Sequence, residues 1–206
     1  MKKRQGEDRI LTIPNVISVI RILLIPLFLI LLYNENNIAA FVVFVVSSIS
    51  DGLDGFIARK FNQVSKLGVV LDPIADRGLL LAGSLMLCII GRLPLWILVL
   101  VLIRDLSFLL GGLYLMRTCN WKPKVIMLGK IATTFFYIGF SMLVLAWPIA
   151  NGVGLIDLSW LPGFNNQIYY VGIWPVYIGI LLNLYTSTHY IKTAFQKLKE
   201  VKNAND

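Results

Sequence analysis

Cysteine and histidine are scarce in this sequence. Among its 206 residues there are two cysteines and one histidine, His189. Cys88 lies in an apolar run and Cys119 in a polar connection, which is too little for a disulfide framework. The sequence also contains no C-x-x-C pair and no cluster of cysteine and histidine with the spacing of a zinc site. A metal in this protein is therefore predicted to have oxygen ligands.

Charged residues are scarce as well. Only 15% of the residues are charged and 57% are hydrophobic, whereas soluble domains contain about 45–50% apolar residues. A membrane-spanning helix needs about 20 mainly apolar residues, because in lipid its backbone must form its hydrogen bonds within the segment. Several stretches reach this length. The composition thus excludes an ordinary soluble domain and predicts an integral membrane protein.

A basic segment, residues 1–9, precedes the first apolar stretch, as it does in secretory signal peptides. That stretch, residues 13–33, is longer than the apolar region of a signal peptide, contains Arg21 and is followed by no cleavage site of small residues. We interpret it as the first membrane helix.

Apolar runs separated by Pro, Gly, Asn and charged residues predict six transmembrane helices and an all-α fold. The predicted spans are 13–33, 38–60, 68–91, 94–117, 125–149 and 168–192. Residues 150–166 form the one long connection. The whole chain, 1–206, is interpreted as a single membrane domain, with residues 1–12 as an N-terminal segment and residues 193–206 as a C-terminal tail.

The 19 Lys and Arg residues are distributed unevenly over the predicted connections. Most of them fall at the termini and around the second and fourth connections, whereas Arg92 stands alone on the opposite side. Because basic loops stay in the cytoplasm, both termini are predicted to be cytoplasmic and the protein to lie in the cell membrane. The net charge of +8 would attract anionic lipid headgroups. Its spread along the membrane boundaries argues against a nucleic-acid partner.

Four aspartates stand out within the predicted helices. Asp51 and Asp54 are three residues apart, Asp72 and Asp76 are four apart, and residues at these spacings share a face of a helix. Each would cost about 2.5 kcal/mol or more at mid-membrane, so a partner or a function is expected. The turn between the two helices is short, which predicts an antiparallel hairpin with converging carboxylates at its cytoplasmic end. Protonation or divalent cations must offset their repulsion, and oxygen ligands suit magnesium, manganese or calcium.

Small residues accompany the aspartates and leave room for a phosphate or nucleotide near the backbone. They are Gly52, Gly55, Ala58 and Gly68. Arg59, one turn after Gly55, is placed to contact a phosphate through its planar guanidinium. Alternatively, the small residues serve close helix packing and the acids pair with nearby Lys and Arg. That alternative explains the glycines but explains four carboxylates at these spacings poorly.

These residues together resemble the signature of the CDP-alcohol phosphotransferase family. The pattern is Asp51-x-x-Asp54-Gly55-x-x-Ala58-Arg59, eight residues, Gly68-x-x-x-Asp72-x-x-x-Asp76. Every signature position matches, with no change of spacing. The opening Ile13-Pro14-Asn15 followed by Arg21, and the six-helix layout, also resemble the bacterial members that synthesise lipids.

The resemblance implies roles for individual residues. Four of them, Asp51, Asp54, Asp72 and Asp76, would hold two divalent ions, Mg²⁺ or Mn²⁺, that bind the diphosphate of a CDP-activated lipid. Asp76 would also be the general base toward the acceptor hydroxyl. The donor lipid would lie against Asn15, Gly55, Arg59 and Ser65. An Asn after Pro is also a common helix cap, and Ser65 is equally readable as a plain loop hydroxyl, so these two roles stay open.

The acceptor site is predicted from basic residues inside helices. Arg21, Arg104 and Lys130 are candidates to bind the phosphate of an acceptor such as glycerol 3-phosphate. The alternative for Arg104 and Asp105 is that they are partnered ionic groups that pin helix positions. Adjacent residues on a helix do not face each other, so Arg104 and Asp105 are not expected to pair with one another.

The resemblance favours transfer of a phosphatidyl group from CDP-diacylglycerol to glycerol 3-phosphate, with release of CMP, by a homodimer. The alternative is cardiolipin synthesis with phosphatidylglycerol as the acceptor, and inositol phosphate or serine acceptors rank below it. A cation channel or transporter is a different class of function. It predicts acids spread through the membrane depth, whereas these four gather at one end.

Overall fold

The computed structural model describes residues 13–60, 68–119, 127–156 and 158–205. In chain order the elements are α1 (Ile13–Tyr33), α2 (Asn37–Lys60), α3 (Gly68–Ile89), α4 (Leu95–Cys119), α5 (Met127–Leu145), β1 (Ile149–Asn151), β2 (Ile168–Tyr170) and α6 (Ile173–Asn205). The chain divides into two compact units, the first reaching Gly91 and including Val144–Ala146, and the second containing the rest.

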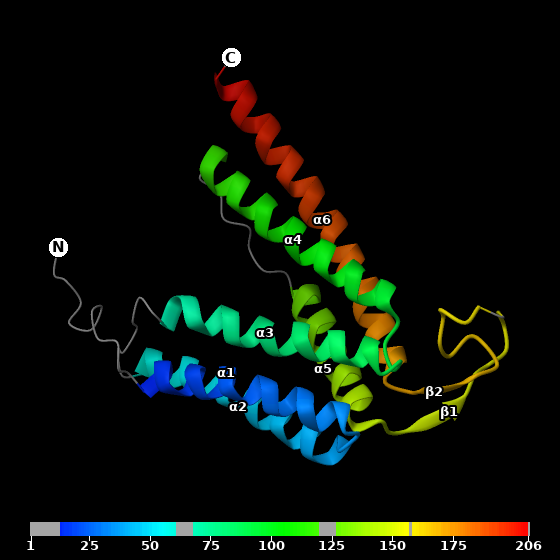
Figure 1. The fold of residues 1–206 in the computed structure, drawn as a ribbon. Coiled ribbons are helices and arrows are strands. Elements are labelled where there is room, and N and C mark those ends of the chain that lie inside the picture. Colours follow the sequence, from blue (N-terminus) through cyan, green and yellow to red (C-terminus); the bar gives the residue numbers. More distant parts are fainter. Residues whose placement is uncertain (1–12, 61–67, 120–126, 157, 206) are drawn as a thin grey trace. The chain divides into compact units, whose positions relative to one another are not determined.

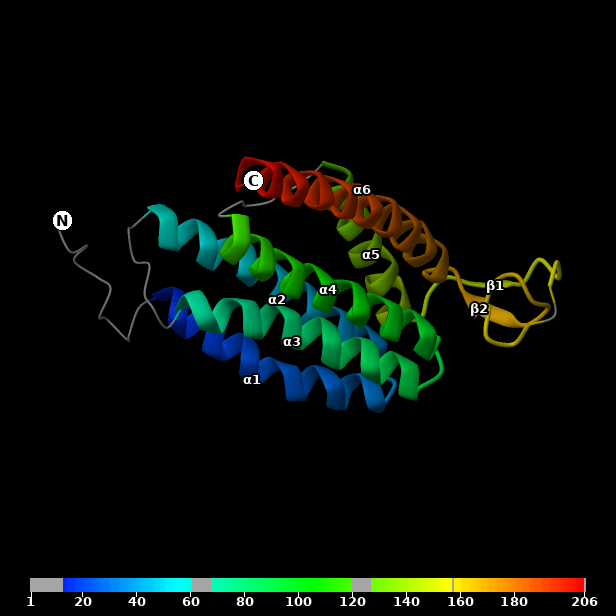
Figure 2. The same ribbon diagram turned by 90° about the horizontal axis from the view of Figure 1, so that it is seen from above.

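The first unit is built around α1, which packs against both α2 and α3 (Figures 1 and 2). Helices α2 and α3 contact each other over a much shorter stretch. The turn after α1 closes when the Asn36 backbone N–H donates to the Leu31 carbonyl at 2.9 Å, and the Asn36 Oδ1 then accepts from the Ala39 N–H at 3.4 Å as α2 begins. Because this turn is short, α1 and α2 run in opposite directions. Helix α3 follows α2 and runs in the same direction as α1.

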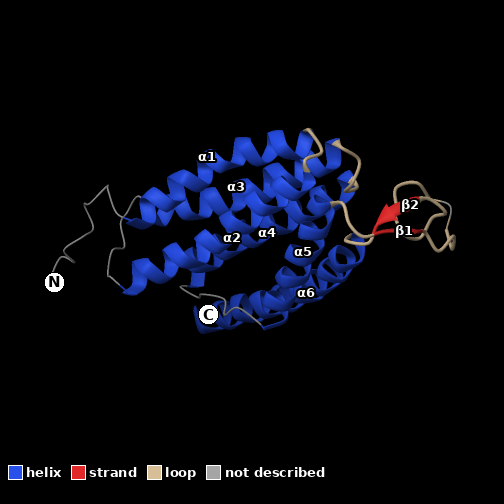
Figure 3. Ribbon diagram, turned by 90° about the horizontal axis from the view of Figure 1, so that it is seen from below, coloured by secondary structure: helices blue, strands red, loops and turns tan. Residues whose placement is uncertain are grey.

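The second unit contains α4, α5, α6 and a small sheet, coloured by element type in Figure 3. Helices α5 and α6 approach closely at two glycines. A Cβ added to Gly139 would come within 2.6 Å of the Gly172 carbonyl oxygen, so neither helix tolerates a side chain there. Small residues at such a crossing bring helix backbones into direct contact, as is common in membranes. At the start of α4, the Arg92 Nη1 donates to the Leu143 carbonyl at 3.4 Å, which places this point beside the end of α5.

The connection between α5 and α6 differs from the sequence prediction. Strands β1 and β2 pair antiparallel, with Ile149 opposite Tyr170 and Asn151 opposite Ile168. The prediction of an all-α chain missed this hairpin. Helix α5 ends at Leu145 and α6 begins at Ile173, whereas residues 125–149 and 168–192 were expected to be helical. The mostly apolar residues 146–149 and 168–172 made the fifth and sixth predicted helices too long, because these residues belong to the hairpin and its flanks.

Helix α6 also extends further than expected at its other end. It continues to Asn205, through the residues predicted as a C-terminal tail. Residues 193–205 are rich in Lys, Gln, Glu and Ala, which have high helix propensity, so the helix propagates beyond the apolar stretch without a packing partner being required.

Within the described residues, three segments are long and apolar enough to cross a membrane: Val16–Tyr33, Leu95–Gly112 and Met127–Leu145. Shorter apolar stretches lie in α2 (Asn37–Ser50) and α3 (Arg77–Ile89). The prediction of a mainly helical fold is therefore confirmed, and three of its helices are candidates to cross a membrane.

Candidate functional site

The acidic signature occupies the C-terminal half of α2 and the N-terminal half of α3, both in the first unit. Asp51 and Asp54 lie in α2, and Asp72 and Asp76 lie in α3. The side chains of these aspartates, of Asn15 and of Arg59, and the surroundings of Gly55, lie outside the described part of the structure, as does the whole of Ser65. Their positions along the helices nevertheless follow from contacts that the described residues make with α1.

The register between α1 and α2 is given by an aromatic contact. The rings of Phe28 and Phe44 lie 6.1 Å apart between centroids, and both side chains are buried. Because the two helices run in opposite directions with equal rise, Asp51 lies level with Arg21, and Asp54 lies level with Ser18.

The register between α1 and α3 is given by Ile25. A Cβ placed on Gly78 would lie 3.3 Å from Cδ1 of Ile25. These helices run in the same direction, so Asp72 is level with Val19 and Asp76 with Leu23. The four aspartates therefore correspond to positions 18–23 of α1, a length of about 7.5 Å along the axis at 1.5 Å per residue. With ideal helix geometry, this register puts the four positions at a similar level along α1.

Polar side chains of α1 and α2 are buried near these same positions of α1. The Arg21 side chain is 1% exposed, and Ser18 and Ser47 are fully buried. Ser47 precedes Asp51 by one turn of α2 and so shares its face. Arg21 was predicted as an acceptor ligand, whereas neither serine was predicted to belong to the site. Their signal in the sequence was the spacing of Ser47 from Asp51 and of Ser18 from Arg21.

Arg104 and Asp105 in α4 form an ion pair, with Nη1 of Arg104 2.8 Å from Oδ1 of Asp105. The expectation that these neighbours would not pair was wrong. The long arginine side chain bends back toward its neighbour, and its guanidinium carbon lies 4.7 Å from the centroid of the Phe108 ring. Both charged side chains are partly buried, 23% and 31% exposed, so mutual neutralisation lowers the cost of placing them in an apolar helix.

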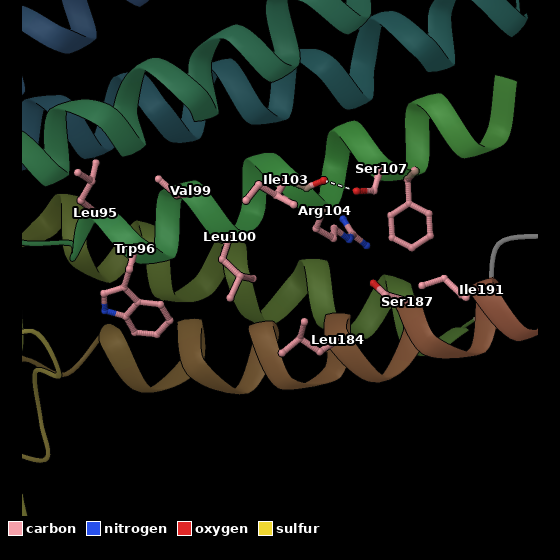
Figure 4. A pocket seen from close by; sticks show the side chains of 11 residues that line it. Leu95, Trp96, Val99, Leu100, Ile103, Arg104, Ser107, Leu184, Ser187 and Ile191 are labelled. Carbon is pink, nitrogen blue, oxygen red and sulfur yellow. Dashed lines mark hydrogen bonds between the residues drawn. The ribbon is translucent and has the colours of Figure 1, made fainter. Parts of the chain in front are cut away.

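Arg104 also lines a groove of about 790 Å³ between α4 and α6. Figure 4 shows the arginine side chain on the α4 wall and Ser187 on the facing α6 wall. The remaining lining is almost wholly apolar, from Leu95 at one end to Ile191 at the other. Lys130, the third predicted acceptor ligand, is an exposed residue of α5 and does not line this groove. The structure thus brings Arg21 to the depth of the aspartates and places Arg104 and Lys130 in the second unit.

The ion pair predicts a specific pattern of stability. Arg104→Gln and Asp105→Asn should each lower the thermal unfolding temperature in detergent, because each leaves one partly buried charge without its partner. The double variant should be no less stable than the worse single variant, with a coupling free energy of about 0.5–3 kcal/mol. Strictly additive losses would show that the two side chains are stabilised by other groups.

Comparison with known proteins bears on most of the chain. The sequence profile of the CDP-alcohol phosphatidyltransferase family matches residues 11–182, which include the four aspartates and the helices from α1 into α6.

The names of individual relatives describe two different activities. The chain is 39% identical over 149 residues to a cardiolipin synthase (CMP-forming) of Streptomyces coelicolor, covering 69% of each chain. It is 34% identical over 165 residues to a CDP-diacylglycerol–glycerol-3-phosphate 3-phosphatidyltransferase of Aquifex aeolicus, covering 79% of this chain and 88% of the relative. A probable phosphatidylglycerophosphate synthase of Mycobacterium tuberculosis is 25% identical over 203 residues, or 96% of this chain.

Proposed function

The chain belongs to the CDP-alcohol phosphatidyltransferase family, and we propose that it transfers the phosphatidyl group of CDP-diacylglycerol to glycerol 3-phosphate in phospholipid synthesis. The products are phosphatidylglycerophosphate and CMP. The observation that carries the proposal is the complete acidic signature, whose four positions lie in α2 and α3, the two helices that pack against α1. The relatives from Aquifex aeolicus and Mycobacterium tuberculosis, whose matches extend over most of the chain, support glycerol 3-phosphate as the acceptor.

Divalent metal is part of this proposal. The donor set fits Mg²⁺ or Mn²⁺, because Asp51, Asp54, Asp72 and Asp76 supply only carboxylate oxygens. Two bound ions would hold the donor diphosphate and neutralise charge that develops on the transferred phosphoryl group and on departing CMP. Asn15, Gly55, Arg59 and Ser65 are proposed to bind the donor, with the Arg59 guanidinium on a phosphate.

Asp76 is proposed to accept the proton of the attacking hydroxyl. The hydroxyl oxygen of glycerol 3-phosphate forms a bond to the lipid-side phosphorus, and the bond from that phosphorus to the CMP oxygen breaks. The proton passes to Asp76 and CMP leaves with the bonding electrons. No covalent enzyme intermediate is needed.

We further propose that the six helices all cross the cell membrane, with both termini and the acidic site on the cytoplasmic side, and that the protein is a homodimer. The support is the excess of Lys and Arg at the termini and around the second and fourth connections. At this face, soluble CMP can leave while the diacylglycerol chains stay in lipid. Light scattering of the purified protein, corrected for detergent, measures the subunit number.

A second acceptor is favoured by a specific observation. The relative from Streptomyces coelicolor is named as a cardiolipin synthase and has the higher identity, although over a shorter part of the chain. Phosphatidylglycerol is therefore the competing acceptor. It differs from glycerol 3-phosphate in carrying two acyl chains, so its site must open to lipid.

The decisive measurement is CMP release by the purified protein in detergent with CDP-diacylglycerol and magnesium. We expect release with glycerol 3-phosphate and little with phosphatidylglycerol, inositol phosphate or serine. Chelation with EDTA should abolish release, and added Mg²⁺ or Mn²⁺ should restore it, because the carboxylates alone repel the donor diphosphate. Release with phosphatidylglycerol alone would reassign the acceptor. Absence of CMP with every acceptor would refute the proposed reaction.

A further inference from the structure

The segment between α5 and α6 forms a folded lobe, residues 146–172, with an unusual surface. Its sequence contains no Lys, Arg or His and one acidic residue, Asp157. Eight large apolar side chains are exposed on its described residues, and we call these the apolar lobe surface: Trp147, Ile149, Val153, Leu155, Ile156, Leu158, Trp160 and Ile168. Ile168 and Leu155 are 73% and 70% exposed. A loop that stands in water ordinarily carries polar side chains, so this surface calls for a partner.

The lobe is held in shape by its own contacts. Beyond the β1–β2 pairing, the backbone N–H groups of Val153 and Ile156 donate to the carbonyls of Gly163 and Phe164, both at 3.1 Å. Asn165 is 2% exposed, and its Nδ2 donates to the Leu158 carbonyl at 3.3 Å. The apolar side chains are therefore displayed by a built structure, and the lobe cannot bury them by simple collapse.

The lobe also lies against the ends of the membrane helices in its own unit. Trp96, in the first turn of α4, donates from Nε1 to the Trp160 carbonyl at 2.9 Å, and the two rings meet edge to face at 5.9 Å. The hydroxyl of Tyr177 in α6 donates to the Pro162 carbonyl at 3.1 Å. Figure 1 shows the lobe at the point where α6 begins.

These contacts set the lobe's depth in a bilayer. The membrane-crossing segment of α4 starts at Leu95, and that of α5 ends at Leu145. The Phe164 ring is 4.8 Å from the ring of Trp174 in the first turn of α6, so this part of the lobe packs against the start of α6. The segment 153–156 lies beside residues 163–164, to which it is joined by backbone hydrogen bonds. The headgroup region on each side of the hydrocarbon is about 5–8 Å thick, so a lobe that folds directly against the ends of the apolar helices begins in this region.

We propose that the lobe inserts its apolar surface into the bilayer interface on the side where α5 ends and α6 begins. Further apolar surface borders the lobe at the start of α4, where Leu95 is 61% exposed beside Trp96. The two tryptophans of the lobe and its lack of basic residues suit the boundary between headgroups and acyl chains. Insertion would anchor the paired ends of α4 and α6. The inference stands independently of which acceptor the enzyme uses.

The test reads the environment of Leu155 directly. In a Cys88→Ser, Cys119→Ser background, Leu155→Cys is labelled with an environment-sensitive fluorophore and reconstituted in phosphatidylcholine–phosphatidylglycerol vesicles. Lipids with a nitroxide near the headgroup should quench this fluorophore, and iodide on both sides of the membrane should not. Quenching by iodide would show a lobe standing in water and overturn the proposal. Protection from both quenchers would show that protein or a second copy covers the surface, which also overturns it.

A matched pair of variants tests whether the apolar side chains cause insertion. Val153→Glu with Ile156→Glu should release the labelled position to iodide, because carboxylates resist entry into lipid. Asn151→Asp with Ser159→Asp adds the same charge at exposed polar positions of the lobe and should leave lipid quenching unchanged. Equal effects of the two pairs would contradict a specific apolar contact. Unchanged thermal unfolding of both proteins checks that the lobe remains folded.

Discussion

Replacement of Asp76 by Asn is expected to lower the rate of CMP release by about 10²–10⁴-fold or more, the range lost when a general base is removed. Asparagine keeps the shape of the side chain, but it cannot accept the hydroxyl proton and supplies one negative charge fewer to a divalent ion. Because Asp76 is placed both as ligand and as base, its loss should exceed that of a residue that does only one of these. The measurement is the initial rate of CMP release at saturating donor, acceptor and magnesium.

Glu35→Gln provides the control for Asp76→Asn. Glu35 is an exposed residue in the turn between α1 and α2, and its replacement removes the same charge without touching the signature. Its rate should stay within about twofold, as surface substitutions normally change little. Full activity in Asp76→Asn, with both proteins folded, would remove Asp76 from the mechanism.

Replacement of Arg21 by Met should lower both stability and turnover. Arg21 is 1% exposed, so its guanidinium is a buried cation, and the helix register puts it at the level of the aspartate positions of α2 and α3. Removing one partner from a buried ionic arrangement typically costs about 3–5 kcal/mol. The thermal unfolding temperature should fall, and kcat should fall with it. Arg21→Lys keeps the charge but loses the planar fork of donors, and should be intermediate.

The kinetics of Arg21→Met also distinguish two roles. A guanidinium that binds the acceptor phosphate would, on removal, raise KM for glycerol 3-phosphate by tenfold or more, which corresponds to about 1.4 kcal/mol or more of binding. If the buried Arg21 instead supports the catalytic site without binding the acceptor, its replacement should lower mainly kcat and leave KM for glycerol 3-phosphate nearly unchanged. The control is Lys192→Met, an exposed cation of α6, which should leave stability and kinetics nearly unchanged.

Sequence patterns located the first three helices closely. Predicted spans of 13–33, 38–60 and 68–91 compare with Ile13–Tyr33, Asn37–Lys60 and Gly68–Ile89. These helices are bounded by short polar turns or breaks in apolarity, which are local signals. The ends of α5 and α6 were misplaced because an apolar run has the same composition in a membrane helix and in a hairpin that exposes Ile149 and Ile168.

Ionic partners were harder to infer than helices. Side-chain direction on an ideal helix argued against a contact between Arg104 and Asp105, yet the flexible arginine side chain forms one at 2.8 Å. Helix geometry fixes only the direction of the Cα–Cβ bond. A long arginine side chain in apolar surroundings can still bend so that its guanidinium reaches a nearby carboxylate. The alternative that these residues are partnered ionic groups is accordingly the one that the structure supports.

By itself, the sequence determined that this protein is a membrane enzyme of the CDP-alcohol phosphatidyltransferase family, because apolar runs and the spacing of four carboxylates are local properties of the chain. Only the tertiary structure decided that α1 packs against both acidic helices, that Arg21 is buried, and that the α5–α6 connection is a folded lobe with an apolar surface. The physical reason is that helix register and burial depend on which distant side chains meet, as Phe28 meets Phe44 and Trp96 meets Trp160.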